Sequence, residues 1–400
     1  MAISKGLILK IFSAANIQRW NDKLRPMELT ELDKQAHKMI IAYVLGKFEE
    51  NDPEFDWQDL IEGGIFEFLQ RIELTDLKPP VFYKIREHRE EYDQLKEWVY
   101  KRLSPVVTPL GENFISRFKN YFSTEDESVS KRIVGAAHFY ATKSEFDIIK
   151  RMNPTDFEIP EIERNISSRQ QEYSNVNGIQ QLDSDSNLSS NLRRFIDVCG
   201  QLRFQLRWGN IRRVTSTSVL GHMLVVAILA YLFSLEIGAC RKRCVNNFLT
   251  GLFHDLPEAL TRDIISPVKG SVEGISDIVK EYEKEQMKDK IYSILPLEWH
   301  SEMKIFAEDE FSDLITIDQQ PKVVSSTKIK KEYNKDEFNP RDGSLVKACD
   351  DLAAFTEAYL AVRNGVTAEA LYQAISDLKG EYKNKSVAGI NFGEIYADFD

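Results

Sequence analysis

An all-α fold is the class that this sequence predicts, and three observations support it. Helical periodicity dominates the chain, whereas alternating apolar and polar residues never persist beyond the length of a short strand. Three segments have the apolar density of buried helices, namely Met223–Leu235, Asn246–Leu256 and Leu345–Val362. A domain built on these segments would have a helical core.

Length and composition predict two such domains. The 400 residues exceed the roughly 100–200 of a usual single domain. A polar, serine-rich stretch with few apolar anchors lies near the middle of the chain. We therefore expect a helical domain over residues 1–160, a polar linker over 161–193 and a second domain over 194–400. A further Lys- and Asp-rich stretch, residues 319–343, is expected to be a surface insertion.

Several function classes are disfavoured by charge and hydropathy. A formal net charge of -11 argues against an extended nucleic-acid-binding surface. The longest apolar run, Met223–Leu235, is too short to span a membrane and is followed by Glu236. The N-terminus has no signal-peptide pattern, and the four cysteines show no CxxC spacing. These features predict a cytoplasmic protein with reduced thiols and no membrane partner.

Ligand-type side chains interrupt the apolar segments. His254 and Asp255 are adjacent within an otherwise apolar run, and burial of both groups is costly unless something binds them. A divalent cation offsets that cost, because imidazole and carboxylate are natural mixed ligands. Asp350 and Asp351 raise the same question, and one of them should face the core. His222 alone would more often be an ordinary buried histidine.

The order of these residues along the chain is His222, then His254 and Asp255, then Asp350. It resembles the H…HD…D motif of the HD-domain phosphohydrolases. The resemblance is closest to the bacterial 5′-deoxyribonucleotidase branch and covers about residues 207–365. The further matching residues are Arg207, Trp208, Glu258, Asp263, Pro267, Val268, Lys269 and Lys347. One departure is Gly221, which stands where that branch often has Glu before the first histidine.

The resemblance implies a site and an activity. One divalent ion (Mn, Co, Mg, Zn or Fe) would be held by His222, His254, Asp255 and Asp350. Glu258 would orient or deprotonate a water molecule and Asp263 would protonate the leaving oxygen. Arg207 and Lys269 would bind phosphate and Trp208 would contact the sugar. The expected enzyme is a 5′-nucleotidase acting on (deoxy)nucleoside monophosphates.

The same residues are compatible with two alternative functions. The first is an HD-type phosphodiesterase or nucleoside triphosphate hydrolase, and the second is a non-catalytic nucleotide-sensing protein. The partner in each case is a nucleotide, and homo-oligomerisation is left open.

The N-terminal half resembles a degenerate copy of the same domain, so the expected architecture is two HD-like helical bundles in tandem. Arg19 and Trp20 precede His37 much as Arg207 and Trp208 precede His222. Alignment of Asp76 with Asp263, an offset of 187 residues (263 − 76), sets Glu67, Phe68 and Arg71 against His254, Asp255 and Glu258. His138 aligns with Asp350. We expect this copy to be non-catalytic, and the alternative is an altered metal site of His37, Glu67 and His138.

Overall fold

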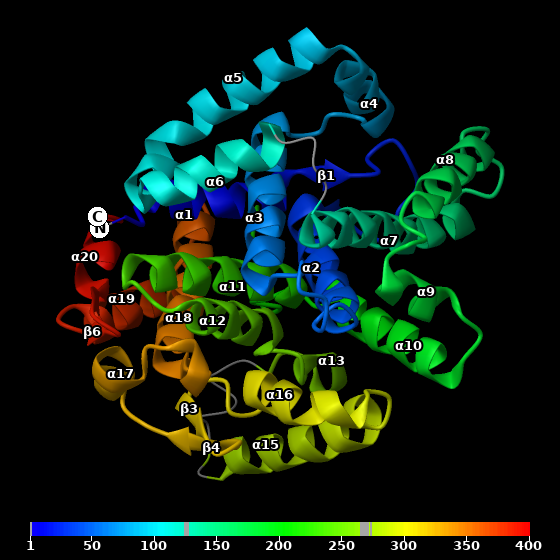
Figure 1. The fold of residues 1–400 in the computed structure, drawn as a ribbon. Helices are drawn as coiled ribbons and strands as arrows, with labels where there is room; N and C mark the ends of the chain where they lie inside the picture. Colours follow the sequence, from blue (N-terminus) through cyan, green and yellow to red (C-terminus); the bar gives the residue numbers. More distant parts are fainter. Residues whose placement is uncertain (1, 124–127, 265–271, 273) are drawn as a thin grey trace.

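The computed structural model describes the whole chain except residues 1, 124–127, 265–271 and 273. The described residues are mainly helical, with only short antiparallel strands (Figure 1), which confirms the all-α class. The strands pair as β1 (Gln18–Arg19) with β2 (Leu29–Thr30), β3 (Asp313–Ile317) with β4 (Gln320–Val323) and β5 (Arg341–Asp342), and β6 (Ser386–Val387) with β7 (Ile390–Asn391).

Helices follow one another along both halves with short connections. Those of the first half are α1 (Lys5–Phe12), α2 (Glu31–Lys47), α3 (Trp57–Leu74), α4 (Pro79–Glu87), α5 (Arg89–Val107), α6 (Glu112–Ser123) and α7 (Val129–Met152). Those of the second half are α11 (Val219–Glu236), α12 (Arg241–Phe253), α13 (Glu258–Thr261), α15 (Ile275–Gln286), α16 (Leu297–Ala307), α17 (Ser326–Lys328), α18 (Gly343–Arg363), α19 (Glu369–Tyr382) and α20 (Phe392–Ala397).

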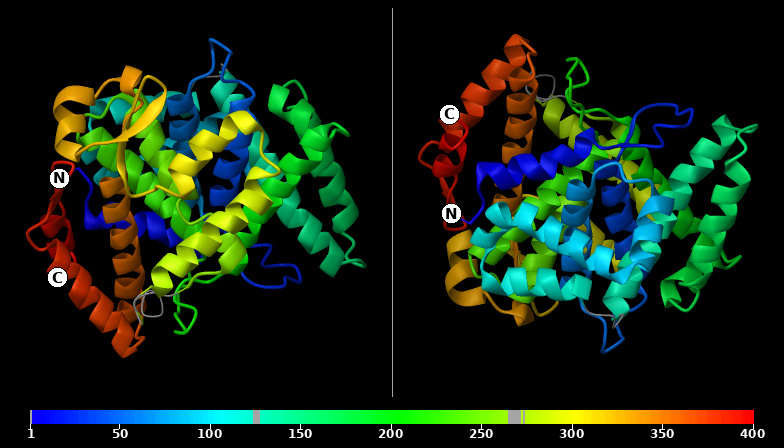
Figure 2. Two further views of the ribbon diagram at one scale, coloured as in Figure 1. Left: turned by 90° about the horizontal axis from the view of Figure 1, so that it is seen from below. Right: turned by 90° about the horizontal axis from the view of Figure 1, so that it is seen from above.

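The segment expected to be a polar linker is largely helical. It contains α8 (Ile159–Gln171), α9 (Asn177–Asp183) and α10 (Asn187–Gln201), which lie along one side of the molecule (Figure 2). Sparse apolar side chains such as Ile179, Leu182 and Leu192 are fully buried. These few apolar side chains attach the helices to the rest of the protein, while the other faces of the helices are exposed to solvent. The division into two domains stays a prediction.

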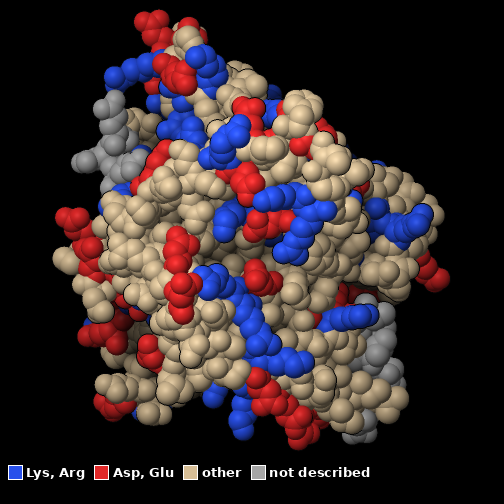
Figure 3. All heavy atoms as spheres, turned by 90° about the vertical axis from the view of Figure 1, so that its right-hand side faces the viewer, with Lys and Arg blue, Asp and Glu red and all other residues tan. Residues whose placement is uncertain are grey.

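The expected surface insertion at 319–343 is exposed along β4 but not at its end. Arg341 and Asp342 are buried, and Asp342 accepts hydrogen bonds of 2.6 and 2.7 Å from the buried Arg243. The bidentate ion pair ties the end of the insertion to α12. On one face of the molecule, Lys and Arg side chains are interspersed with Asp and Glu (Figure 3).

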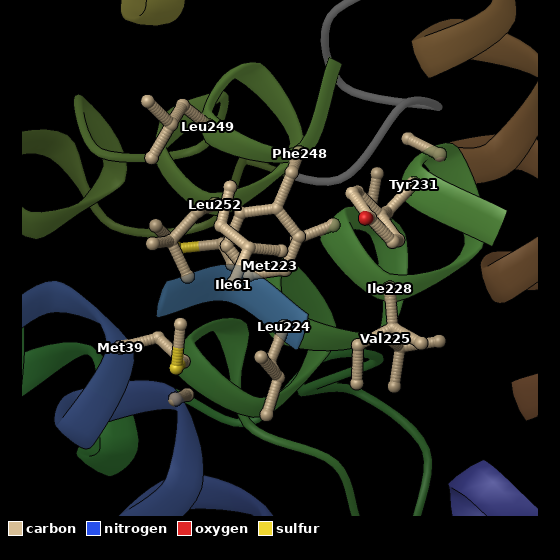
Figure 4. Packing of buried hydrophobic residues seen from close by; sticks show 14 of the residues in the cluster. Met39, Ile61, Met223, Leu224, Val225, Ile228, Tyr231, Phe248, Leu249 and Leu252 are labelled. Atoms are coloured by element: carbon tan, nitrogen blue, oxygen red, sulfur yellow. The ribbon is translucent and has the colours of Figure 1, made fainter. Parts of the chain in front are cut away.

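Helix α11 is the centre of the core. It packs on α12, α18 and α2, and residues 219–234 are all buried. Length and composition would allow it to cross a membrane, but 89% of its apolar window is buried within the protein. This confirms the prediction of a buried helix. Met39 and Ile61 of the first half lie against Leu224 and Leu252 of the second (Figure 4), and one apolar cluster runs through both halves.

A close crossing of α11 and α12 depends on Gly251. A Cβ atom at this position would lie 2.7 Å from the backbone of Ala227, which cannot move away cheaply. We expect Gly251→Ala to destabilise the protein by about 1–3 kcal/mol, the usual cost of overpacking a core. The matched control is Gly380→Ala on exposed α19, where a Cβ meets nothing within 4 Å. It should raise the thermal midpoint, because alanine is the better helix former.

Candidate metal centre

Three helices bring the predicted ligands together. Ser218 caps α11 by accepting a hydrogen bond from the Gly221 amide, which sets His222 in the first turn. His254 follows directly on the last residue of α12, and Asp350 lies within α18. The apolar residues of α11, α12 and α18 are buried against one another and bring these polar side chains into the interior with them.

The ligand atoms converge on one point. His222 Nε2 lies 3.0 Å from Asp350 Oδ1, and His254 Nε2 lies 3.2 Å from Asp255 Oδ2. The cross distances, from His222 Nε2 to Asp255 Oδ2 and from His254 Nε2 to Asp350 Oδ1, are 4.0 and 3.9 Å. Two imidazoles and two carboxylates thus share a volume in which a single cation could be bound.

Asp350, not Asp351, faces the two histidines. Asp351 instead accepts hydrogen bonds from Tyr382 Oη at 2.8 Å and from Lys347 Nζ at 2.7 Å. Lys347 also donates to Asp350 at 3.0 Å. The choice that the sequence left open is therefore decided by the rotation of α18 about its axis.

The residues fit a cation. His254 Nδ1 donates to the Gly251 carbonyl at 2.9 Å. Its Nε2 is buried and makes no hydrogen bond of ordinary geometry within the described residues, although Asp255 is near. Burial alone would lower the pKa of His254, but Asp255 and Asp350 outweigh it and raise the pKa to about 9. The field that holds a proton on this nitrogen also favours a cation in the proton's place.

Both carboxylates are held in their charged form. Burial alone would raise the pKa of Asp255, but His254 and Arg207 outweigh it and lower the pKa to about 2. For Asp350, Lys347 and His222 likewise outweigh burial and hold its pKa well below the ordinary value. Ionised carboxylates are the form that binds metal.

Glu357 is a buried hub that the sequence argument missed. It accepts hydrogen bonds from His222 Nδ1 at 3.2 Å, Trp208 Nε1 at 2.9 Å and Thr217 Oγ1 at 2.8 Å, and Arg207 Nε lies 3.4 Å away. Burial would raise the pKa of Glu357, but Arg207 and His222 hold it below the ordinary range. Because His222 donates from Nδ1, its Nε2 is directed at the centre. The signal in the sequence was an acidic residue two turns after Asp350 in an apolar helix.

Replacement of Glu357 by glutamine is expected to weaken metal binding by about 10–100-fold while the protein remains folded. An amide lacks the charge that orients His222 and pairs with Arg207. Metal affinity measured by competition with a chelator tests this expectation, with the exposed Glu369→Gln on α19 as the control. Unchanged affinity in Glu357→Gln would show that Glu357 only supports the fold.

His254, Asp255 and Asp350 of the centre line a cavity of about 880 Å³, whereas His222 is buried and does not line it. Arg207, Trp208, Glu258 and Asp263 also line it, so the structure brings these predicted residues together with the centre. Arg207 Nη1 lies 3.4 Å from Asp255 Oδ2. The third predicted substrate contact, Lys269, lies outside the described residues, as do Pro267 and Val268.

Glu310 is a second cavity residue that the sequence argument missed. Its Oε2 atom is buried and makes no hydrogen bond to a described residue. Burial raises the pKa of Glu310, and the charge of His254 opposes that shift. No motif marks this residue, since it belongs to the acidic run 308–310 at the end of α16.

The first half does not reproduce this centre. His37 Nε2 lies 3.1 Å from the Ile196 carbonyl and Nδ1 lies 2.9 Å from Arg203, so His37 faces α10 rather than His138. His37 lies seven residues after Thr30, the N-cap of α2, whereas His222 lies four residues after Ser218, the N-cap of α11, so the two histidines differ in position relative to their helix caps. Within the described residues, the group whose ligand atoms all lie within 4.8 Å of one another is His222, His254 and Asp350; Asp255 lies outside this group, although its Oδ2 is 3.2 Å from His254 Nε2.

Comparison with known proteins agrees with the centre. Residues 199–379 match the family model described as HD domain, so this part of the chain contains an HD domain. That match spans the four converging side chains and indicates a metal-dependent phosphohydrolase in general. No curated protein matches the chain.

Proposed function

We propose that the second half of the chain is a phosphohydrolase that removes the 5′-phosphate from nucleoside monophosphates, with deoxynucleotides preferred. The observation that carries the proposal is that His254, Asp255 and Asp350 line a cavity together with Arg207, and that the buried His222 lies 3.0 Å from Asp350. A volume of about 880 Å³ is within the usual range for small-molecule sites.

Each side chain has a chemical task in this proposal. The four converging residues would hold the cation, which when bound lowers the pKa of water and polarises the phosphate. Arg207 presents a guanidinium fork to two phosphate oxygens. Glu258, 7% exposed at the start of α13, would accept the proton of the attacking water. Asp263, in its protonated form, would donate its proton to the leaving sugar oxygen.

The charge of the cavity favours a monophosphate over a triphosphate. Arg207, Lys280, Lys284 and Lys347 line it, but besides the candidate ligands and acid–base residues so do the acidic side chains of Glu283, Glu308, Asp309, Glu310, Asp351 and Asp377. A triphosphate would bring more negative charge toward these carboxylates than a monophosphate does. The same argument disfavours the triphosphate hydrolase alternative.

A substrate screen tests the proposal. Purified protein is incubated with Mn²⁺, Co²⁺, Mg²⁺ or Zn²⁺ and with nucleoside 5′-monophosphates, their deoxy forms, cyclic nucleotides and triphosphates, and released phosphate is measured. If the proposal is correct, more phosphate is released from monophosphates than from the other substrates, and the Asp350→Ala protein releases none. Preferred cleavage of cyclic or triphosphorylated substrates would replace it with the first alternative. Saturable nucleotide binding without turnover under any metal would favour a sensor.

A further inference from the structure

Arg19 and Trp20 of the first half make the contacts that Arg207 and Trp208 make in the second. Arg19 Nε and Trp20 Nε1 donate to Glu145 of α7, at 2.8 and 3.0 Å. Arg207 and Trp208 contact Glu357 in the same way, and both tryptophans have positive φ values, 54° and 58°. Residues other than glycine rarely adopt a positive φ. Its occurrence at the tryptophan of both Arg-Trp pairs therefore supports a common backbone conformation in the two halves.

The helix caps set the register between the halves. Thr30 Oγ1 accepts from the Asp33 amide and Ser218 Oγ from the Gly221 amide, so each caps the helix that follows it. Counted from these caps, Lys34 stands where His222 stands. Downstream, Thr75 and Arg262 both end a helix with positive φ, 52° and 67°. Their offset of 187 residues (262 − 75) sets Glu67 and Phe68 against His254 and Asp255.

Lys34 contacts the residue that corresponds to Asp350. Its Nζ lies 2.6 Å from His138 Nδ1, as His222 Nε2 lies 3.0 Å from Asp350 Oδ1. His138 precedes Glu145 by seven residues, as Asp350 precedes Glu357. In the first half, a direct hydrogen bond between an amine and an imidazole therefore lies where the second half has two candidate metal ligands, His222 and Asp350.

We infer that the first half is a second copy of the fold in which the hydrogen bond from Lys34 to His138 replaces the bound cation. This half would then hold its α2–α7 pair together by side chains alone, and the protein would bind one metal ion per chain. The inference goes beyond the proposed activity, because it concerns a centre outside that cavity.

The surrounding side chains support a closed, metal-free centre. Phe68 offers no ligand atom where the second half has Asp255. The nearby carboxylates already have cationic partners: Glu31 lies 2.8 Å from Arg19 and 3.4 Å from Arg71, and Glu67 lies 3.1 Å from Lys38. Entry of a divalent cation would place it beside several basic groups in a medium that screens charge weakly. Burial lowers the pKa of Lys34 well below its ordinary value, and the bond to His138 does not require a charged amine.

Metal content of matched variants tests the inference. The full-length protein is loaded with Mn²⁺, desalted and analysed for metal. We expect one equivalent in the parent, one in His138→Ala, and loss of metal in Asp350→Ala, the corresponding change in the second half. Two equivalents in the parent, with one lost in His138→Ala, would overturn the inference.

A second measurement addresses the hydrogen bond itself. Lys34→Met and His138→Leu should each lower the thermal midpoint by several degrees, because each leaves one buried polar group unsatisfied. The double variant removes both groups and should recover most of that loss, with Mn²⁺ content unchanged. A double variant whose midpoint falls by the sum of the two single shifts would show that Lys34 and His138 are not partners, and would sink the inference.

Discussion

Asp350→Ala is expected to abolish metal binding and phosphate release together. The change removes a charged group 3.0 Å from His222 Nε2, and it leaves the two imidazoles without their shared anionic neighbour on α18. Loss of a ligand atom and loss of its negative charge both weaken the binding of a divalent cation in a buried site. Metal analysis and a phosphate-release assay on the same preparation measure the two effects.

The adjacent residue supplies a matched control. Asp351→Asn alters a carboxylate one position away that is bonded to Tyr382 and Lys347 rather than to a histidine. This variant should keep its metal. If Asp351→Asn loses the metal while Asp350→Ala retains it, the two roles are reversed and the orientation of α18 assigned to the centre is wrong.

Glu258→Gln should keep the metal but lower kcat by about 10²-fold or more, the usual scale for loss of a positioned acid–base group. The amide is nearly isosteric with the carboxylate but cannot accept the proton of water. Metal content, kcat and KM are measured together, so that a loss of turnover is separated from a loss of the cation.

The control for this change is Glu281→Gln on α15, where the side chain is exposed. It should match the parent in both metal content and rate. Equal kcat for Glu258→Gln and the parent would assign Glu258 a structural role, and Asp263 would then be the residue to vary next.

Much of the candidate site could be predicted from sequence, because its logic is local. His254 and Asp255 are adjacent in an otherwise apolar run, and burial of such groups has a cost that spacing and residue type reveal. The buried α11 and the all-α class followed from hydrophobic periodicity in the same way. These features depend on neighbours within a few residues.

The remaining features depend on contacts between residues far apart in the chain. The choice of Asp350 over Asp351 follows from which face of α18 meets α11, and Glu357 becomes a hub only because Arg207, Trp208 and Thr217 are folded against it. The helices of the polar segment 161–193 likewise depend on distant contacts, because their few apolar side chains are buried against the rest of the protein.

The register of the first half shows the difference most directly. Sequence spacing predicted His37 as the counterpart of His222, because Arg19 and Trp20 precede His37 much as Arg207 and Trp208 precede His222. In the structure, Lys34 lies four residues after the cap of its helix, as His222 does, and its amine is 2.6 Å from His138. Residue types and their order thus determined by themselves the helical class, and they predicted the candidate metal ligands of the second half. Which side chains face each centre was decided only by tertiary packing, because helix rotation and long-range burial are not encoded in any local spacing.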